Sequence, residues 1–210
     1  MKNLLMLLCS GVVLGGAAVA APFNENLLVN STATSSNMTG WTVTANGGSG
    51  WSVDSGVFYT SYQWDIRTQT IDLLSAGFSA DILDASPDIR VGVNINADWG
   101  GQYFINCQIQ DASHNVLATF SVGSQSSPIT TNSNFSGAFE WVGTTLSDYA
   151  SGARYIVYTD GGKDTRNWLG QYGTRFKEAE VTVIPEPATV SVLSLGVLLL
   201  GLYRRFYGRA

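Results

Sequence analysis

A few residues in this chain have side chains suited to catalysis, and their spacing limits what they can do. The single histidine, His114, falls in the turn of "QDASHNVLATF", where nothing is spaced to complete a Ser/His/Asp triad or a His/Cys metal site. Asp160 and Asp164 are a carboxylate pair of the kind that glycosidases use, but no aligned acid and base can be assigned. Cys107, on the apolar face of "YFINCQIQ", is expected to be a buried small hydrophobe. We therefore predict no enzyme, no cofactor and no metal.

A glycine-rich stretch, "NADWGGQ" at residues 96–102, places an acid beside an indole. A carboxylate can accept hydrogen bonds from sugar hydroxyls, and an indole can stack on the apolar face of a sugar ring. Asp98 and Trp99 are therefore candidate carbohydrate-binding residues. The same pattern fits a hairpin whose tryptophan only caps the core, and both interpretations stay open at this point.

The elements that must position these side chains are short segments with period-2 alternation, separated by Gly, Ser and Asn. There are about ten of them, including "VFYTSYQW", "IRVGVNI" and "ARYIVYT". No stretch outside the two ends of the chain sustains helical periodicity, although residues 74–83 can hold one short helical turn. The pattern predicts an all-β fold, a jelly-roll-like antiparallel β-sandwich with a site in the loops at one of its ends.

The first twenty residues are typical of an export signal, with Lys2 before an apolar stretch and Ala18-Val19-Ala20 as the cleavage site. Residues 21–184 then fit one domain. This domain keeps seven of the 11 basic and 15 of the 16 acidic residues, a formal net charge of −8, so nucleic acid is not expected as a partner. Cys107 is its only cysteine, which excludes an internal disulfide.

The other end of the chain, residues 185–210, starts with Pro185-Glu186-Pro187, continues with an uncharged apolar stretch and finishes with an arginine cluster. The arginines favour the cytoplasmic side, which places the domain outside. This three-part tail resembles the PEP-CTERM sorting signal of Gram-negative bacteria. The resemblance implies a transient transmembrane helix, processing by an exosortase, and release to the cell surface or an extracellular polysaccharide matrix. A plain C-terminal anchor is the alternative.

The domain itself resembles the F-box-associated domain of the sugar-recognising F-box proteins, shared with the non-specific cytotoxic cell receptor of fishes. The matching stretches are "NLLVN", "GWTVTANGGSGWSV", "TSYQWDIRTQTIDL" and "YIVYTDGGKDTRNWLGQYGTRF". No F-box is present, so the ubiquitin-ligase role does not follow. The resemblance implies that Trp41, Trp51 and Trp64 belong to the scaffold. The glycines of "NGG" at residues 46–48 predict a turn between adjacent antiparallel strands, because glycine tolerates the positive φ that such turns require.

The resemblance also implies a site in "DGGKDTRNWLGQYG". In glycan-binding relatives this loop carries an aromatic pair followed by a lysine, and the equivalent positions here are Asn167, Trp168 and Leu169. Only the tryptophan is kept, which puts recognition of chitobiose in doubt. Asn167 and Trp168 can still bond a hydroxyl and stack on a sugar. The family's longer loop before "TSYQW" is shortened here.

Two functions follow as hypotheses. The first is an exported, non-catalytic carbohydrate-binding module that attaches to exopolysaccharide or another glycan. The alternative is a structural matrix protein that uses the sandwich for protein contacts without binding sugar.

Overall fold

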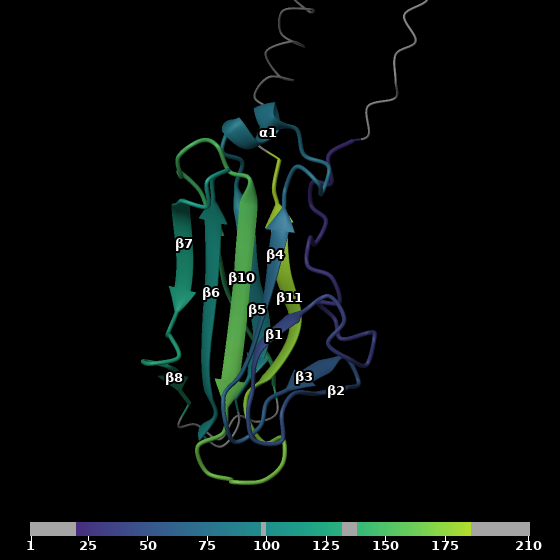
Figure 1. The fold of residues 1–210 in the computed structure, drawn as a ribbon, viewed down its shortest axis with the longest axis vertical. Helices are drawn as coiled ribbons and strands as arrows, with labels where there is room; N and C mark the ends of the chain where they lie inside the picture. The colour runs from purple at the N-terminus through teal and green to yellow at the C-terminus, as the bar shows by residue number, and fades with distance from the viewer. Residues whose placement is uncertain (1–19, 98–99, 132–137, 186–210) are drawn as a thin grey trace, which may run out of the picture.

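The computed structural model describes residues 20–97, 100–131 and 138–185, which form two antiparallel sheets (Figure 1). The first sheet has the order β1, β4, β10, β6, β7, with β8 paired to β6: β1 (Thr42–Asn46), β4 (Asp65–Asp72), β10 (Tyr155–Lys163), β6 (Gln102–Gln110), β7 (Val116–Val122) and β8 (Ile129–Thr130). The second has the order β2 (Ser52–Asp54), β3 (Val57–Tyr59), β11 (Arg175–Val183), β5 (Ile89–Asn96) and β9 (Glu140–Leu146). These eleven strands of the described residues confirm the predicted antiparallel sandwich.

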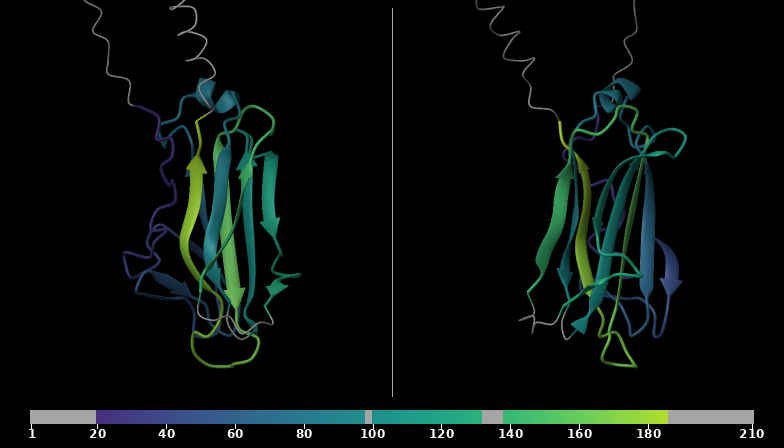
Figure 2. Two further views of the ribbon diagram at one scale, coloured as in Figure 1. Left: turned by 180° about the vertical axis from the view of Figure 1, so that it is seen from behind. Right: turned by 90° about the vertical axis from the view of Figure 1, so that its left-hand side faces the viewer.

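The two sheets lie face to face as separate layers, which the side view in Figure 2 shows, and the core fills the space between them. Ile105, Cys107 and Ile109 of β6 are fully buried, as the alternation predicts. Burial raises the pKa of the Cys107 thiol to about 12, so this group is a packing element and not a nucleophile. Val91 of β5 and Val181 of β11, in the second sheet, are also fully buried and belong to the same hydrophobic core. Removal of this apolar surface from water is the main source of stability.

A buried ion pair crosses the first sheet on its inner face. Arg67 of β4 and Asp160 of β10 are directly opposite in the strand register, and both side chains are fully buried. The guanidinium donates from Nε to Oδ1 at 2.7 Å and from Nη2 to Oδ2 at 2.9 Å. It also lies over the ring faces of Trp41 at 3.8 Å and Phe58 at 3.9 Å. Asp160 is therefore a structural carboxylate rather than one half of an acid/base pair.

One end of the sandwich holds the short helix α1 (Ala80–Asp84), within the segment where one helical turn is predicted (Figure 1). Ser79 caps it by accepting a hydrogen bond from the Ile82 amide. The first and last described residues lie toward this end, since the Asn24 amide donates to the Val183 carbonyl at 3.0 Å. The loop between β10 and β11 lies at the opposite end.

Two tryptophans behave as expected and one does not. Trp41 is buried, and Trp51 packs on the core with its ring 6.1 Å from that of Phe176. Trp64, predicted to be part of the scaffold core, is only half-buried and lies outside the core. Its ring meets Phe104 edge-on, with the centroids 5.6 Å apart. Trp64 and Ile66 are two residues apart and therefore share one face of the segment. The following residue, Arg67, lies on the opposite face and points into the core.

The turn at residues 46–50 also differs from the expectation. It joins β1 to β2, but β1 pairs with β4 and β2 pairs with β3, so the turn passes from one sheet to the other. Gly48 has a φ of +59°, and a Cβ there would lie 2.8 Å from the Tyr62 ring, so glycine is required. The Asn46 side chain closes the turn by accepting the Trp51 amide at 2.8 Å.

The predicted end segments lie almost entirely outside the described residues. Of the signal peptide only Ala20 is described, and of the sorting motif only Pro185, which is exposed. Within the part of the chain that the structure describes, no helix has the length and apolar character needed to cross a membrane.

Candidate functional site

The β10–β11 loop (residues 164–174) is built around one carboxylate. Asp164 directly follows β10 and is only 3% exposed. Its Oδ1 accepts the Arg166 amide at 2.8 Å, and its Oδ2 accepts the Asn167 amide at 2.9 Å. Such bonds from a short acidic side chain to the following amides fix a turn locally. Asp164, like Asp160, therefore has a structural role.

The fixed turn presents apolar side chains to solvent. Trp168 is 81% exposed, Leu169 65% and Tyr172 60%. Three large apolar groups this exposed within five residues form a patch of the kind that marks an interaction surface. An indole used for stacking must be accessible in the free protein, and Trp168 meets that condition.

Asn167, the other predicted residue of this loop, uses part of its side chain in a hydrogen bond within the protein. Its side-chain amide donates to Asp164 Oδ2 at 2.5 Å, which fixes the side chain against the carboxylate that builds the turn. Its carbonyl oxygen is the group that remains available to a ligand hydroxyl. Asn167 thus combines a positioning role with one possible hydrogen bond.

The loop borders two open hollows. One, of about 410 Å³, is lined by Arg166, Asn167, Trp168, Leu169, Gly170 and Tyr172; we call it the Trp168 hollow. The other, of about 400 Å³, is lined by Ser52, Asp54, Tyr59, Gly170, Gln171 and Tyr172. Tyr172 belongs to both. Volumes of this size suit a small ligand or a few sugar units.

The 46–50 turn supports this loop from the side. The Gly170 amide donates to the Ser49 hydroxyl at 3.3 Å, and the Gln171 side chain donates to the Ser49 carbonyl at 3.3 Å. The glycine-rich "NGGSG" is therefore a turn that holds the candidate loop in place. The sequence contains no local signal for this contact, because residues 49 and 170 are 121 positions apart.

The second predicted pair, Asp98 and Trp99, lies outside the described residues. The next residue, Gly100, contacts the β10–β11 loop, since the Thr165 hydroxyl donates to its carbonyl at 2.7 Å. The described residue Gly100 of the first stretch therefore meets the β10–β11 loop at the same end of the sandwich.

His114 lies far from these loops, in the hairpin turn between β6 and β7 where the sequence places it. Its ring stacks on Tyr155 at 4.5 Å between centroids, and its Nδ1 is 3.2 Å from the Gln110 side-chain oxygen. These contacts account for the residue without a chemical function.

Asp65 holds the segment that follows β3 at the same end as the candidate loop. Its Oδ2 accepts the Ser61 amide at 2.6 Å, which fixes the turn that carries Tyr62, Gln63 and Trp64. Its side chain is fully buried, and its Oδ1 has no hydrogen-bond partner among the described residues. Burial therefore raises the pKa of this carboxyl to about 6, even though the Ser61 hydrogen bonds favour the charged form.

This raised pKa predicts a stability change with pH. Between about pH 4 and pH 6 the folded state keeps a proton that the unfolded state has lost, so the free energy of unfolding falls as the pH rises. The loss is complete above pH 6 and amounts to about 3 kcal/mol. Asp65→Asn keeps an acceptor for the Ser61 amide and removes the titration. Urea unfolding at pH 4.5 and pH 7 should show a smaller difference in the variant, and an unchanged difference would contradict the assignment.

The fold and the loop define an antiparallel β-sandwich with an exposed aromatic loop at one end. Residues 18–183 match the F-box associated region family, and the chain belongs to this family. The resemblance seen in "TSYQWDIRTQTIDL" and the late loop is thereby confirmed.

Among curated relatives, human F-box only protein 6 is 33% identical over 181 residues, which cover 78% of this chain and 60% of that protein. The Bos taurus F-box only protein 6 is 34% identical over 177 residues, covering 76% of this chain and 65% of the relative. The chain thus spans less than two thirds of the length of these relatives. Among solved structures, TmCBM61 in complex with β-1,4-galactotriose has a TM-score of 0.44 and 14% identity, covering 76% of this chain and 99% of that one. At that level the likeness says nothing about the ligand here.

Proposed function

We propose that this chain is an exported, non-catalytic carbohydrate-binding protein that binds glycan through its β10–β11 loop. The observation that carries the proposal is the 81% exposed indole of Trp168 on a loop fixed by a buried carboxylate. Membership of a family that includes sugar-recognising proteins supports it. Preorganisation matters because a rigid loop loses little entropy when a ligand binds.

In this proposal the indole of Trp168 stacks on the apolar face of one sugar ring, and Tyr172 closes the hollow beside it. The Asn167 carbonyl oxygen accepts a hydroxyl. Leu169 stands where glycan-binding relatives have a lysine, so the proposal does not extend to the chitobiose of those relatives. Binding by one stacking surface in an open hollow is weak, on the order of micromolar to millimolar.

Trp168→Ala tests this function directly. We expect the variant to lose all detectable binding on a glycan array and in titrations against matrix polysaccharide, because the stacking surface is removed. Trp141→Ala is the matched control, since Trp141 is a partly exposed tryptophan on β9, the edge strand of the second sheet, and does not line the Trp168 hollow. If no glycan binds the unchanged chain, or if Trp168→Ala binds like the unchanged chain, the proposal fails.

A structural matrix protein is the second candidate, and Leu169 is the observation that favours it. A 65% exposed leucine beside Trp168 makes an apolar surface that suits a protein partner as well as a sugar. Under this function no sugar perturbs the tryptophan fluorescence, and Leu169→Ser weakens capture of a matrix protein. Sugar-dependent fluorescence lost in Trp168→Ala decides against it.

We also propose that residues 1–20 direct export and that residues 185–210 act as an exosortase-processed sorting tail with a transient membrane helix. The motif that begins at the exposed Pro185 supports this route to the cell surface or the matrix. Mass spectrometry of surface-fraction protein should find no peptide that contains Arg209.

A further inference from the structure

Some basic residues of the domain form ion pairs with described carboxylates and others do not. The described residues include seven: Arg67, Arg90, Arg154, Lys163, Arg166, Arg175 and Lys177. Four form ion pairs with carboxylates, and Arg175 lies over the Tyr59 ring among other interactions. Lys163 and Arg166 form no ion pair with any described carboxylate. Lys163 is the last residue of β10 and Arg166 lies near the start of the β10–β11 loop, so both are at the end of the molecule that carries the candidate site.

Each of these two cations borders a hollow of similar composition. Arg166 lines the Trp168 hollow together with the amide of Asn167 and the indole of Trp168. Lys163 lines a second open groove of about 330 Å³, the Trp64 groove, whose other lining residues are Gly47, Tyr62, Gln63 and Trp64. In both, a cation, an indole and an amide stand together, and no carboxylate is among the lining residues.

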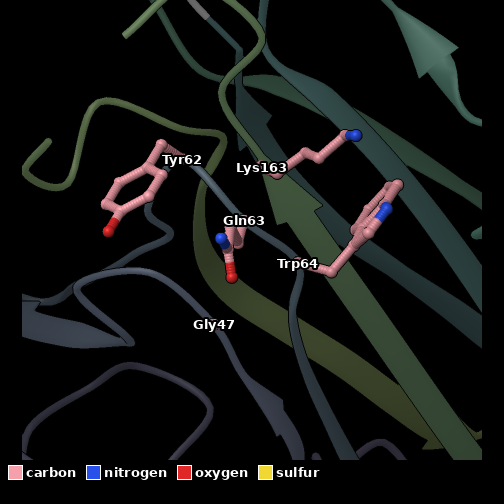
Figure 3. A pocket seen from close by; sticks show the side chains of 5 residues that line it. All are labelled: Gly47, Tyr62, Gln63, Trp64 and Lys163. Carbon is pink, nitrogen blue, oxygen red and sulfur yellow. The ribbon is translucent and has the colours of Figure 1, made fainter. Parts of the chain in front are cut away.

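Figure 3 shows how the Trp64 groove is arranged. Lys163 reaches from the end of β10 toward the ring of Trp64, with its Nζ 5.3 Å from the ring centroid. Gln63 lies between Trp64 and Tyr62, and its side-chain oxygen accepts the Gly48 amide at 3.2 Å. This bond fixes the orientation of the Gln63 side-chain amide. The NH₂ group of that amide has no hydrogen-bond partner among the described residues. Phe104 supports the indole from the side.

This set of groups matches one kind of ligand. An indole stacks on a sugar ring, an amide NH₂ donates to a hydroxyl, and an ammonium pairs with a carboxylate. A protein domain with a formal net charge of −8 repels polyanions over most of its surface, so two cations beside the candidate site that pair with no described carboxylate are the exception. Electrostatic complementarity of this kind selects the partner and its orientation.

We propose that the Trp64 groove is a second glycan subsite that takes a sugar carrying a carboxylate, so that the ligand is an acidic polysaccharide. The proposal rests on the proposed function, because the Trp168 hollow is the first subsite. Lys163 and Arg166 are three positions apart, at most about 11 Å along an extended chain. The Cα atoms of these two residues therefore lie within the length of a short oligosaccharide.

The test compares acidic oligosaccharides with their uncharged methyl esters. Fragments of polygalacturonate, alginate and hyaluronate are titrated into the full chain in detergent at low salt, each beside its ester. We expect at least one acid to bind about tenfold more tightly than its ester, with the preference shrinking as salt is added. Lys163→Gln should remove most of that preference by weakening the acid far more than its ester, and Lys163→Arg should retain the preference. Lys177→Gln, at a lysine paired with Glu178 on the second sheet, is the control and should change nothing.

Three outcomes separate this inference from the function beneath it. If every ester binds as tightly as its acid, or if Lys163→Gln weakens acid and ester equally, the acidic subsite is wrong. Glycan binding that is still lost in Trp168→Ala then leaves the proposed function intact. If no glycan of any kind binds the unchanged chain, both fail.

Discussion

Asp160→Ala should lower the free energy of unfolding by about 3–5 kcal/mol, because it leaves a buried guanidinium without its carboxylate. Arg67 and Asp160 are both fully buried, and two hydrogen bonds join them at 2.7 and 2.9 Å. Tyr158 adds a third bond to Asp160, from its hydroxyl to Oδ2 at 3.1 Å. Removing the carboxylate therefore leaves a cation and a phenol unsatisfied between the two sheets. Urea denaturation followed by tryptophan fluorescence measures the loss.

The matched control replaces both charges. Arg67→Met combined with Asp160→Leu keeps apolar volume over the rings of Trp41 and Phe58 and removes the buried charges together. Exchange of a buried ion pair for apolar residues of similar size is often neutral or stabilising. The double variant should therefore be more stable than Asp160→Ala. An Asp160→Ala variant as stable as the unchanged chain would show that the pair is not buried in the way described.

Trp41→Ala should cost about 3–5 kcal/mol of unfolding free energy, whereas Trp168→Ala should cost about 1 kcal/mol or less. Trp41 is 7% exposed and lies edge-on to Phe58 and Tyr158, with centroids 6.1 and 5.9 Å away. Its indole nitrogen donates to the Asn30 carbonyl at 3.3 Å, so truncation opens a cavity and breaks a hydrogen bond. Trp168 is 81% exposed and leaves no comparable cavity.

The same denaturation curves compare both variants with the unchanged chain. Equal and large losses in both would mean that the loop tryptophan is structural and that any carbohydrate site lies elsewhere. A small loss in Trp168→Ala together with lost glycan binding separates the recognition surface from the scaffold.

Much of the fold could be predicted because period-2 alternation is a local property. The buried face of β6 at Ile105, Cys107 and Ile109 and the hairpin turn at His114 both follow from neighbouring residues. The start of β4 could not be predicted in the same way. In "WDIRTQ" the apolar face is that of Trp64 and Ile66, yet Arg67 points inward. Its neutralising carboxylate comes from Asp160, 93 positions away.

In the candidate site, too, some features follow from contiguous sequence and others depend on the fold. Family resemblance is enough to single out Trp168, because the motif around it is contiguous. The support from Ser49, the positioning of Asn167 by Asp164, and the pairing of Lys163 with Trp64 depend on strands brought together by the fold. Which cations lack an ion-pair partner among the described residues likewise depends on the fold, because the other cations pair with carboxylates that are distant in the sequence.

The placement of the β10–β11 loop opposite α1 determines how the molecule would stand on a support. The first and last described residues lie at the α1 end, and β10 alone runs nine residues, about 30 Å at roughly 3.3 Å per residue. Attachment through either terminus would hold the exposed aromatic residues of the β10–β11 loop about 30 Å from the surface to which the protein is attached, facing away from that surface. Many copies fixed side by side would then present an array of weakly binding loops to one long polysaccharide. A polysaccharide bound to one copy meets the binding loop of the next copy at high effective concentration. An array of such molecules would therefore retain the polysaccharide far longer than a single copy can.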